Sequence, residues 1–274
     1  RLTSQHVTVA LGGDGGDELF GGYTTYNREF SRRFFARVPA GVRAFIAGSA
    51  KRSMPLGMRG RQYLSSLGSG SRENFVNYTL LFDSHARQGL LVNDLWQLLG
   101  VHREEPENYR LDLLSPKDHC LVDQMTRADF CSYLVDDILV KIDRASMAVS
   151  LEMRAPFLDK EIIEFAFSKV PANLKVNRGE RKILLRLLAQ QLLPPDLDLR
   201  RKQGFSLPPS IWLNKDWVNL CENTLLMSDG MMFNNKEIAK LIKYQQSNVS
   251  VSGYLFALVM FELWRQHYDV SISY

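Results

Sequence analysis

A glycine-rich stretch near the start of the chain, at 12–23, constrains the fold more than any other feature. It reads G-G-D-G-G-D-E-L-F-G-G-Y and follows a short β-branched run at 6–11. Glycines permit positive φ angles and let a ligand approach the backbone closely. The run before them is typical of a buried strand. The pattern therefore predicts a strand, a tight turn and a helix that begins near Glu18.

The chemistry of this turn points to an anion, because backbone amides beside a helix N-terminus favour negative charge. Asp14 and Asp17 are hard oxygen ligands that suit Mg²⁺ held together with phosphate. Two common glycine motifs do not fit: the dinucleotide fingerprint would need glycine where Glu18 stands, and the Walker A pattern would need lysine where Gly22 stands. The alternative is a flexible, acidic surface turn.

Composition limits the class of protein. With 274 residues, 45% of them hydrophobic, the chain can bury a substantial core, and a net charge of +4 does not require nucleic acid or a membrane as a partner. The longest apolar run, 254–261, is too short to span a bilayer. The three cysteines lack C-x-x-C spacing, which indicates reduced thiols and a cytoplasmic protein, and the scattered histidines predict no zinc site.

Beyond the turn the pattern is helical, and we expect no strand comparable to 6–11. Helices are expected over 18–35, over 73–100 in two pieces, over 120–150 and in the tail 209–274, whereas 47–72 and 101–117 are expected to be connections. The first helix carries an aromatic stripe assigned to core packing: Phe20, Tyr23, Tyr26, Phe30 and Phe34. The chain by itself is therefore predicted to be mainly α-helical with an N-terminal strand.

The segment 120–150 has the strongest helical period. Its predicted buried face carries Ile138, Ile142, Ala145 and Val149, and another face carries Asp137, Lys141 and Arg144. An extended segment follows, in which Glu152 and Arg154 lie on the same side because they are two residues apart. Asp159 is placed to cap a helix that begins at Lys160.

A basic region covers 175–202. Lys182 and Arg186 are expected on one face of a helix, and the apolar residues are expected to bury the other: Ile183, Leu184, Leu187 and Leu188. A solvated face is the ordinary interpretation of such a charge run. The functional alternative is an anion site, because the compact charge of lysine suits pyrophosphate.

Four stretches, 12–23, 141–159, 180–186 and 201–208, together resemble the synthetase domain of the asparagine synthetase (glutamine-hydrolysing) family. In this order, they resemble its S-G-E-G-S-D-E…G-G-Y turn, its D-R-x-x-M…S-x-E-x-R-x-P-F-L-D segment, its E-K-x-x-L-R helix and its R-x-K-x-G-F-x-x-P loop. The resemblance implies that the parent domain is α/β, a PP-loop ATP pyrophosphatase of the adenine nucleotide α-hydrolase type. It also implies that 1–274 is the C-terminal part of that domain, with 1–35 ending the nucleotide-binding sheet region and 36–274 forming a mainly helical portion.

The resemblance carries roles over by position. Gly12 and Gly13 take the place of residues that contact the nucleotide, and Asp17 takes that of an acid that holds Mg²⁺ on pyrophosphate. Asp14 replaces the family's frequent Glu, which assists adenylate formation. Lys182 and Lys202 take the place of lysines that contact the pyrophosphate in the family. Glu152 and Arg154 take the place of an acid and a base near the acyl site.

The implied reaction uses ATP and Mg²⁺ to activate a carboxylate substrate, aspartate by resemblance, as an acyl-AMP. Ammonia from glutamine, released by an N-terminal glutaminase domain, then forms the amide. The family's S-G-G-x-D-S loop and its terminal Cys nucleophile are not found in this sequence, so the chain is expected to be a fragment that is inactive alone. The resemblance leaves the oligomeric state open, a homodimer included.

Two alternatives stay open. The same chemistry could act on another acceptor, such as a carboxylated sugar or a secondary metabolite, and aspartate dependence separates this case from asparagine synthesis. The chain could instead be a non-catalytic helical module, although the joint presence of Asp14, Asp17, Lys182 and Lys202 argues against it.

Overall fold

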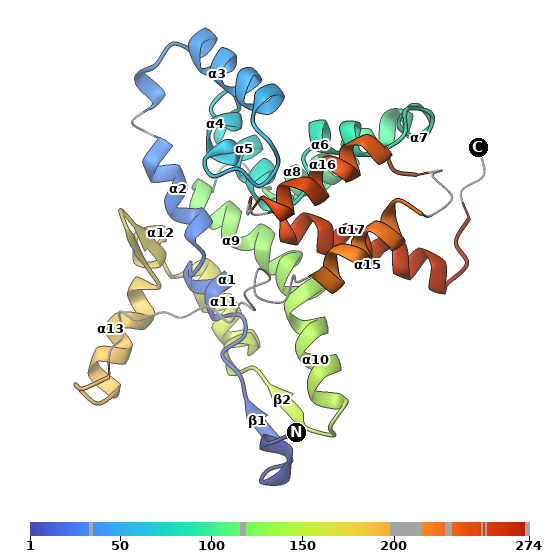
Figure 1. The fold of residues 1–274 in the computed structure, drawn as a ribbon. Helices are drawn as coiled ribbons and strands as arrows, with labels where there is room; N and C mark the ends of the chain where they lie inside the picture. Colours follow the sequence, from blue (N-terminus) through green and yellow to red (C-terminus); the bar gives the residue numbers. More distant parts are fainter. Residues whose placement is uncertain are drawn as a thin grey trace. The chain divides into compact units, whose positions relative to one another are not determined.

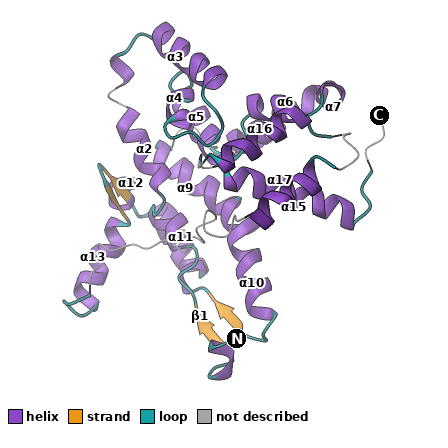
Figure 2. Ribbon diagram, viewed as in Figure 1, coloured by secondary structure: helices purple, strands orange, loops and turns teal. Residues whose placement is uncertain are grey.

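The computed structural model describes residues 1–32, 35–115, 119–197, 215–227, 232–247, 249 and 251–271. These residues are mostly helical, and they include two small two-stranded sheets (Figures 1 and 2). The chain divides into two units: the first comprises 1–37, 71–75 and 109–203, and the second comprises 38–70, 76–108 and 204–274. The expected boundary at 35/36 concerns the parent polypeptide and stays a prediction.

The first unit contains both sheets. Its elements are η1 (Thr3–Gln5), β1 (Val9–Leu11), α1 (Gly16–Phe20), α2 (Thr24–Arg32), η2 (Phe35–Arg37), α9 (Leu121–Cys131), η4 (Leu134–Leu139, a π-helix), α10 (Val140–Met147), β2 (Glu152–Arg154), η5 (Pro156–Leu158), α11 (Lys160–Ser168), α12 (Ala172–Lys175), β3 (Val176–Asn177), β4 (Glu180–Arg181) and α13 (Ile183–Leu192). The boundary between the units falls within α5 (Ser71–Thr79) and α8 (Glu105–Leu113).

The predicted N-terminal strand exists, but it is shorter and more exposed than expected. β1 covers Val9–Leu11 and pairs in parallel with β2, with Val9 opposite Glu152 and Leu11 opposite Arg154 (Figure 2). The side chain of Leu11 is 72% exposed, so the prediction of a buried strand is wrong for the described chain. β2 coincides with the extended segment expected at Glu152 and Arg154, but its pairing with β1 was not predicted, because three residues with an alternating polar pattern give a weak strand signal.

The helix expected over 18–35 is two helices. α1 ends at Phe20 because Gly21 adopts a left-handed conformation with φ of 72°, and α2 begins at Thr24. The aromatic stripe is confirmed as core where its side chains are described and buried, at Phe20 and Tyr26. Phe34 lies outside the described residues, and the side chain of Phe30 is likewise not described.

The core of the first unit packs α1 against α11. Leu19 and Phe20 of α1 meet Ala166 and Val170, and partly buried aliphatic and aromatic side chains surround them: Phe130, Phe157, Ile162, Ile163, Phe167, Leu174, Leu184 and Leu185. Asp159 caps α11 as predicted, since its carboxylate accepts a hydrogen bond of 2.9 Å from the Glu161 amide. This packing fixes the helix that directly follows the glycine turn.

The segment 120–150 is not one regular helix. A break at Ser132 separates α9 from η4, and α10 ends at Met147. The expected buried face is only half-buried at Ile138, Ile142 and Val149, and Ala145 is exposed, whereas Ser146 is buried. The break and the π-helix interrupt the continuous 3.6-residue period on which the expected face was based.

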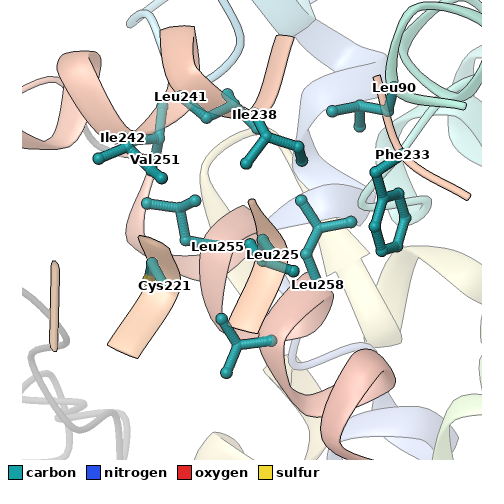
Figure 3. Close-up of a cluster of buried hydrophobic side chains, with 11 residues drawn as sticks. Leu90, Cys221, Leu225, Phe233, Ile238, Leu241, Ile242, Val251, Leu255 and Leu258 are labelled. Atoms are coloured by element: carbon teal, nitrogen blue, oxygen red, sulfur yellow. The ribbon is translucent and has the colours of Figure 1, made fainter. Parts of the chain in front are cut away.

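The second unit is helical in its described part. It contains α3 (Ala40–Ser53), α4 (Arg61–Ser65), α6 (Ser84–Leu90), α7 (Asn93–Leu98), η3 (Gly100–Glu104), α15 (Lys215–Leu225), α16 (Asn235–Gln246) and α17 (Ser252–His267). Its core is formed by Leu90, by residues of the last three helices and by Phe233 and Val251 in the segments that precede α16 and α17. Figure 3 shows Leu225, Ile238, Leu255 and Leu258 pointing toward one another. The tail therefore has the helical, core-packing role that its pattern predicts.

Two expected connections are helical in part. The segment 47–72 contains the end of α3 and all of α4, and 101–117 contains most of η3 and all of α8. Small residues explain the first error: Ala47 and Ala50 are buried, and an added Cβ at Gly68 would lie 3.2 Å from the Ala47 Cβ. The segment 73–100 forms α5, α6 and α7 rather than two pieces.

Candidate functional site

The glycine turn at 12–16 lies between β1 and α1, where the strand–turn–helix prediction placed it. The Gly12 amide donates a hydrogen bond of 2.8 Å to the Arg154 carbonyl, which continues the β1–β2 ladder into the turn. Gly15 has φ of 84°, a left-handed conformation that favours glycine. An added Cβ at Gly15 would lie 2.3 Å from Leu158 Cδ2, so glycine is required there for packing as well.

One position in the turn has open space in front of it. An added Cβ at Gly13 meets no other atom within 4 Å, and the residue is exposed. The next residue, Asp14, is partly buried, and its carboxylate lies beside Gly12, where an added Cβ would be 2.5 Å from Oδ2. The turn thus combines an accessible backbone at Gly13 with a carboxylate one residue away.

Lys182 reaches the turn from a distant part of the sequence. Its Nζ lies 3.0 Å from Oδ1 of Asp17, and both side chains are about a quarter exposed, at 27% and 28%. An added Cβ at Gly22 would be 1.6 Å from that same Oδ1, so the absence of a side chain at Gly22 makes room for the ion pair. Arg181 donates a hydrogen bond of 2.8 Å to the Gly22 carbonyl and holds the same corner.

The backbone of Lys182 differs from the prediction. Lys182 does not lie on a helix face with Arg186; it precedes α13 with φ of 52°, in the left-handed region. The predicted buried face of this helix is wrong at Leu187 and Leu188, which are half exposed, whereas Leu184 and Leu185 pack against the core. An uncommon conformation at a lysine that contacts the turn marks this position as a candidate functional site.

Glu152 and Arg154 lie on β2, the strand that pairs with β1. They project to the same side, as their spacing predicts, and Arg154 Nε lies 2.7 Å from Glu152 Oε1 in an exposed ion pair. The structure therefore places Lys182 beside Asp17 at the glycine turn, and the Arg154 carbonyl beside Gly12. Glu152 lies further along β2, opposite Val9, and its side chain pairs with that of Arg154. Lys202 lies outside the described residues.

Two buried carboxylates beneath the turn were not identified as site residues from the sequence. Glu18 is 2% exposed and accepts a hydrogen bond from the Tyr23 hydroxyl, and burial raises its pKa despite that bond. Asp129 is 3% exposed, accepts a bond of 2.7 Å from Tyr26, and burial raises its pKa to about 6. Glu18 could have been found from its place in the glycine-rich motif, but nothing in the sequence links Tyr26 to Asp129.

Part of the basic region is structural. Lys175 is fully buried, its Nζ lies 3.0 Å from Asp123 Oδ1, and it stands 5.1 Å from the centre of the Phe167 ring. This lysine stabilises the packing of α12 and is unavailable to a ligand. The charge run therefore divides into a buried cation at Lys175 and an accessible one at Lys182.

The described residues contain no cluster of three or more His, Cys, Asp or Glu that could hold a metal by itself. A magnesium ion at Asp17 would need further oxygen ligands, and phosphate oxygens supply them in sites where Mg²⁺ is held by one or two carboxylates. One accessible carboxylate beside an amide-rich turn fits such a shared site. Among the described helices, none is both long and apolar enough to cross a membrane.

A parallel strand pair that leads through a glycine turn into a helix is the arrangement found at the carboxyl ends of strands in α/β proteins. A lysine and an aspartate lie beside this turn. The chain belongs to the asparagine synthase family, since that family's model matches residues 1–266. The family assignment made from four motifs is thereby confirmed.

Curated relatives carry matching names. The chain is 31% identical over 266 residues to asparagine synthetase [glutamine-hydrolyzing] 1 of Bacillus subtilis, covering 96% of this chain and 41% of the relative. It is 34% identical over 218 residues to a putative asparagine synthetase [glutamine-hydrolyzing] of Mycobacterium tuberculosis, covering 78% of this chain and 32% of the relative. The chain thus spans less than half the length of these relatives, and no solved structure gave a significant match.

Proposed function

We propose that the protein carrying this chain is an ATP-dependent amidotransferase that makes asparagine from aspartate. The observation that carries the proposal is the contact between Lys182 and Asp17 at the corner of the glycine turn, 3.0 Å long and open to solvent. The negative charge of a bound triphosphate must be neutralised, and Lys182 can contribute a cation beside the backbone amides of the turn. Asp17 can contribute a carboxylate to hold Mg²⁺ there. Family membership supports this chemistry over other uses of an anion site.

The first step of the proposed reaction forms the acyl-adenylate. A carboxylate oxygen of aspartate attacks the α-phosphorus of ATP, and the bond to the β-phosphate bridging oxygen breaks to release pyrophosphate. Lys182 and Lys202 would stabilise the charge that develops on pyrophosphate, and the amides of Gly12 and Gly13 would contact the nucleotide. Asp17 would hold Mg²⁺, which would supply electrostatic neutralisation of the phosphates.

The second step forms the amide. Ammonia released from glutamine attacks the acyl carbon, AMP leaves, and one proton is lost from nitrogen. Glu152 and Arg154 on β2 would line the acyl side of the site. Asp14 would act earlier, in the first step, by assisting formation of the adenylate. The parent domain is proposed to have the α/β PP-loop architecture, with 1–35 closing its sheet region, and an N-terminal glutaminase domain supplies the ammonia in the cytoplasm.

The test is a product assay on the full-length protein. With ATP, glutamine and Mg²⁺ present, we expect release of pyrophosphate and AMP that depends on added aspartate, together with asparagine in equal amount. A rate of pyrophosphate release that is independent of aspartate but increases with another carboxylate would favour the alternative acceptor. The double variant Asp17→Asn and Lys202→Ala addresses the non-catalytic alternative, because a purely structural module would keep its cellular function.

A further inference from the structure

A cavity of 210 Å³ lies in the second unit, where no residue of the proposed active site is found. The C-terminal end of α3, the turn that follows it, α4, α6 and α16 form its wall. α6 and α16 lie side by side in Figure 1. The proposed amidotransferase reaction assigns no role to this cavity.

The wall of the cavity is strongly basic. Its charged side chains and its one histidine are Lys51, Arg52, Arg61, His85, Glu237 and Lys240. Three of them come from the basic segment 47–72, whose sequence suggested only a connection. The end of α3 and the start of α4 both border the cavity, so the positive charges of Lys51, Arg52 and Arg61 lie around it.

Two of the cations are balanced by carboxylates, and two are not. Lys240 pairs with Glu237 on α16, and Arg61 Nη1 lies 3.6 Å from Asp83 Oδ2. Within the described ranges, no carboxylate lies within ion-pair distance of Lys51 or Arg52. The cavity therefore carries an excess of positive charge that the described protein does not neutralise.

Arg61 is built into the wall. Its side chain is only 7% exposed, and its Nε donates a hydrogen bond of 3.0 Å to the Met54 carbonyl. Asp83, at 3.6 Å, is beyond hydrogen-bond distance, so among the described residues the N–H groups on the two Nη atoms donate to no protein acceptor. These N–H groups can therefore donate to a ligand or to water in the cavity.

The floor of the cavity is apolar. Ala86 and Leu90 of α6 and Leu241 of α16 line it and are buried, and the half-buried Leu56 lines it as well. An organic group that leaves water on this floor gains about 0.8 kcal/mol per CH₂. The cavity is smaller than the ~300–1,000 Å³ typical of drug-sized ligands, so it suits a molecule of a few carbon atoms.

We propose that this cavity is a binding site for a small phosphate monoester, whose phosphate meets Lys51, Arg52 and Arg61 and whose short organic part covers the apolar floor. A phosphate monoester carries about −1.5 to −2 charge at pH 7, which matches the two unbalanced cations. Arginine presents paired donors to phosphate oxygens. The site is independent of the amidotransferase reaction and would be filled whether or not that reaction takes place.

The test is calorimetric titration of the full-length protein with propyl phosphate and, separately, with inorganic phosphate. We expect propyl phosphate to bind about tenfold more tightly than inorganic phosphate, because only the ester covers the floor. The double variant Lys51→Ala and Arg52→Ala should lower the affinity for propyl phosphate by about tenfold or more. Arg52 is exposed, Lys51 is half-buried, and neither has an ion-pair partner among the described residues, so the fold should survive.

The matched control removes two other exposed cations of the same unit, Arg59→Ala and Lys243→Ala, which do not line the cavity. It changes the net charge equally and should leave the affinity unchanged. Lys182→Ala separates the two sites, because binding that survives this variant cannot occur at the glycine turn. Equal weakening by both double variants, loss of binding in Lys182→Ala, or no heat up to about 10 mM ligand would overturn the proposal.

Discussion

Lys182 Nζ lies 3.0 Å from Asp17 Oδ1 although the two residues come from widely separated parts of the sequence. Each side chain is more than a quarter exposed, so the pair is formed and yet within reach of a ligand. Arg181, through the Gly22 carbonyl, and the left-handed backbone of Lys182 fix its place at the turn. A ligand with phosphate groups would find both charges already positioned, which lowers the cost of ordering them on binding.

Replacing Lys182 by alanine should lower the rate of aspartate-dependent pyrophosphate release by about 10²–10³. The reason is that the variant removes a charge proposed to stabilise the departing pyrophosphate. Lys169→Ala is the matched control, because Lys169 is an exposed lysine of the same unit without an ion-pair partner among the described residues. A Lys182→Ala enzyme as fast as the control would remove Lys182 from the proposed site.

Replacing Lys182 by glycine should give a more stable protein than replacing it by alanine. Both variants lose the contact with Asp17, but only glycine adopts φ of 52° without steric cost. We expect the free energy of unfolding to differ by about 1 kcal/mol in favour of glycine, measured by urea denaturation. Equal stability of the two variants would mean that the left-handed backbone at this position is not strained.

Burial of Asp129 should make the protein less stable as the pH rises from about 4 to 7. The pKa of this carboxyl is raised from 3.8 to about 6 in the folded state, so between these values the folded protein binds more protons than the unfolded chain. Stability therefore falls with rising pH in this window and is lower by about 3 kcal/mol above it.

The variant Asp129→Asn isolates this effect, because its amide oxygen can still accept from Tyr26 but does not titrate. Urea denaturation of both proteins across this range should show the variant gaining stability relative to the unchanged protein as the pH rises. A difference in unfolding free energy that stays constant with pH would contradict a raised pKa at Asp129.

Two glycines on either side of α1, Gly13 in the turn and Gly21 after the helix, should respond differently to alanine. Gly21→Ala should cost ~2–4 kcal/mol of stability, because the residue has φ of 72° and the added Cβ would lie 2.4 Å from Val176 Cγ2. Gly13→Ala meets no atom within 4 Å and should leave the melting temperature unchanged. In the full-length enzyme Gly13→Ala should nevertheless raise the KM for ATP, since the methyl group occupies the space proposed for the nucleotide.

Both variants are measured by thermal unfolding and by steady-state kinetics. If Gly13→Ala keeps both its melting temperature and its KM for ATP, the open space in front of Gly13 is not the nucleotide's place. If Gly21→Ala is as stable as Gly13→Ala, then neither the left-handed conformation nor the contact with Val176 constrains the turn.

Local sequence patterns determined several features correctly. Glycines at 12–16 after a β-branched run indicated a strand and a turn, and Asp159 before a helical period indicated a cap, which the structure confirms. Four short motifs in order indicated the family that the comparison over residues 1–266 confirms. Such signals are local: they depend on backbone conformation and hydrogen bonds between residues close in sequence.

Only the tertiary structure decided which residues meet. The parallel pairing of β1 with β2, the contact of Lys182 with Asp17 and the hydrogen bond from Tyr26 to Asp129 join segments far apart in the chain. Burial could not be predicted from the sequence either, since Lys175 in a basic run is fully buried while Leu11 in an apolar run is largely exposed. The physical reason is that burial and long-range contacts depend on what packs against a residue, whereas the sequence period describes only the element to which it belongs.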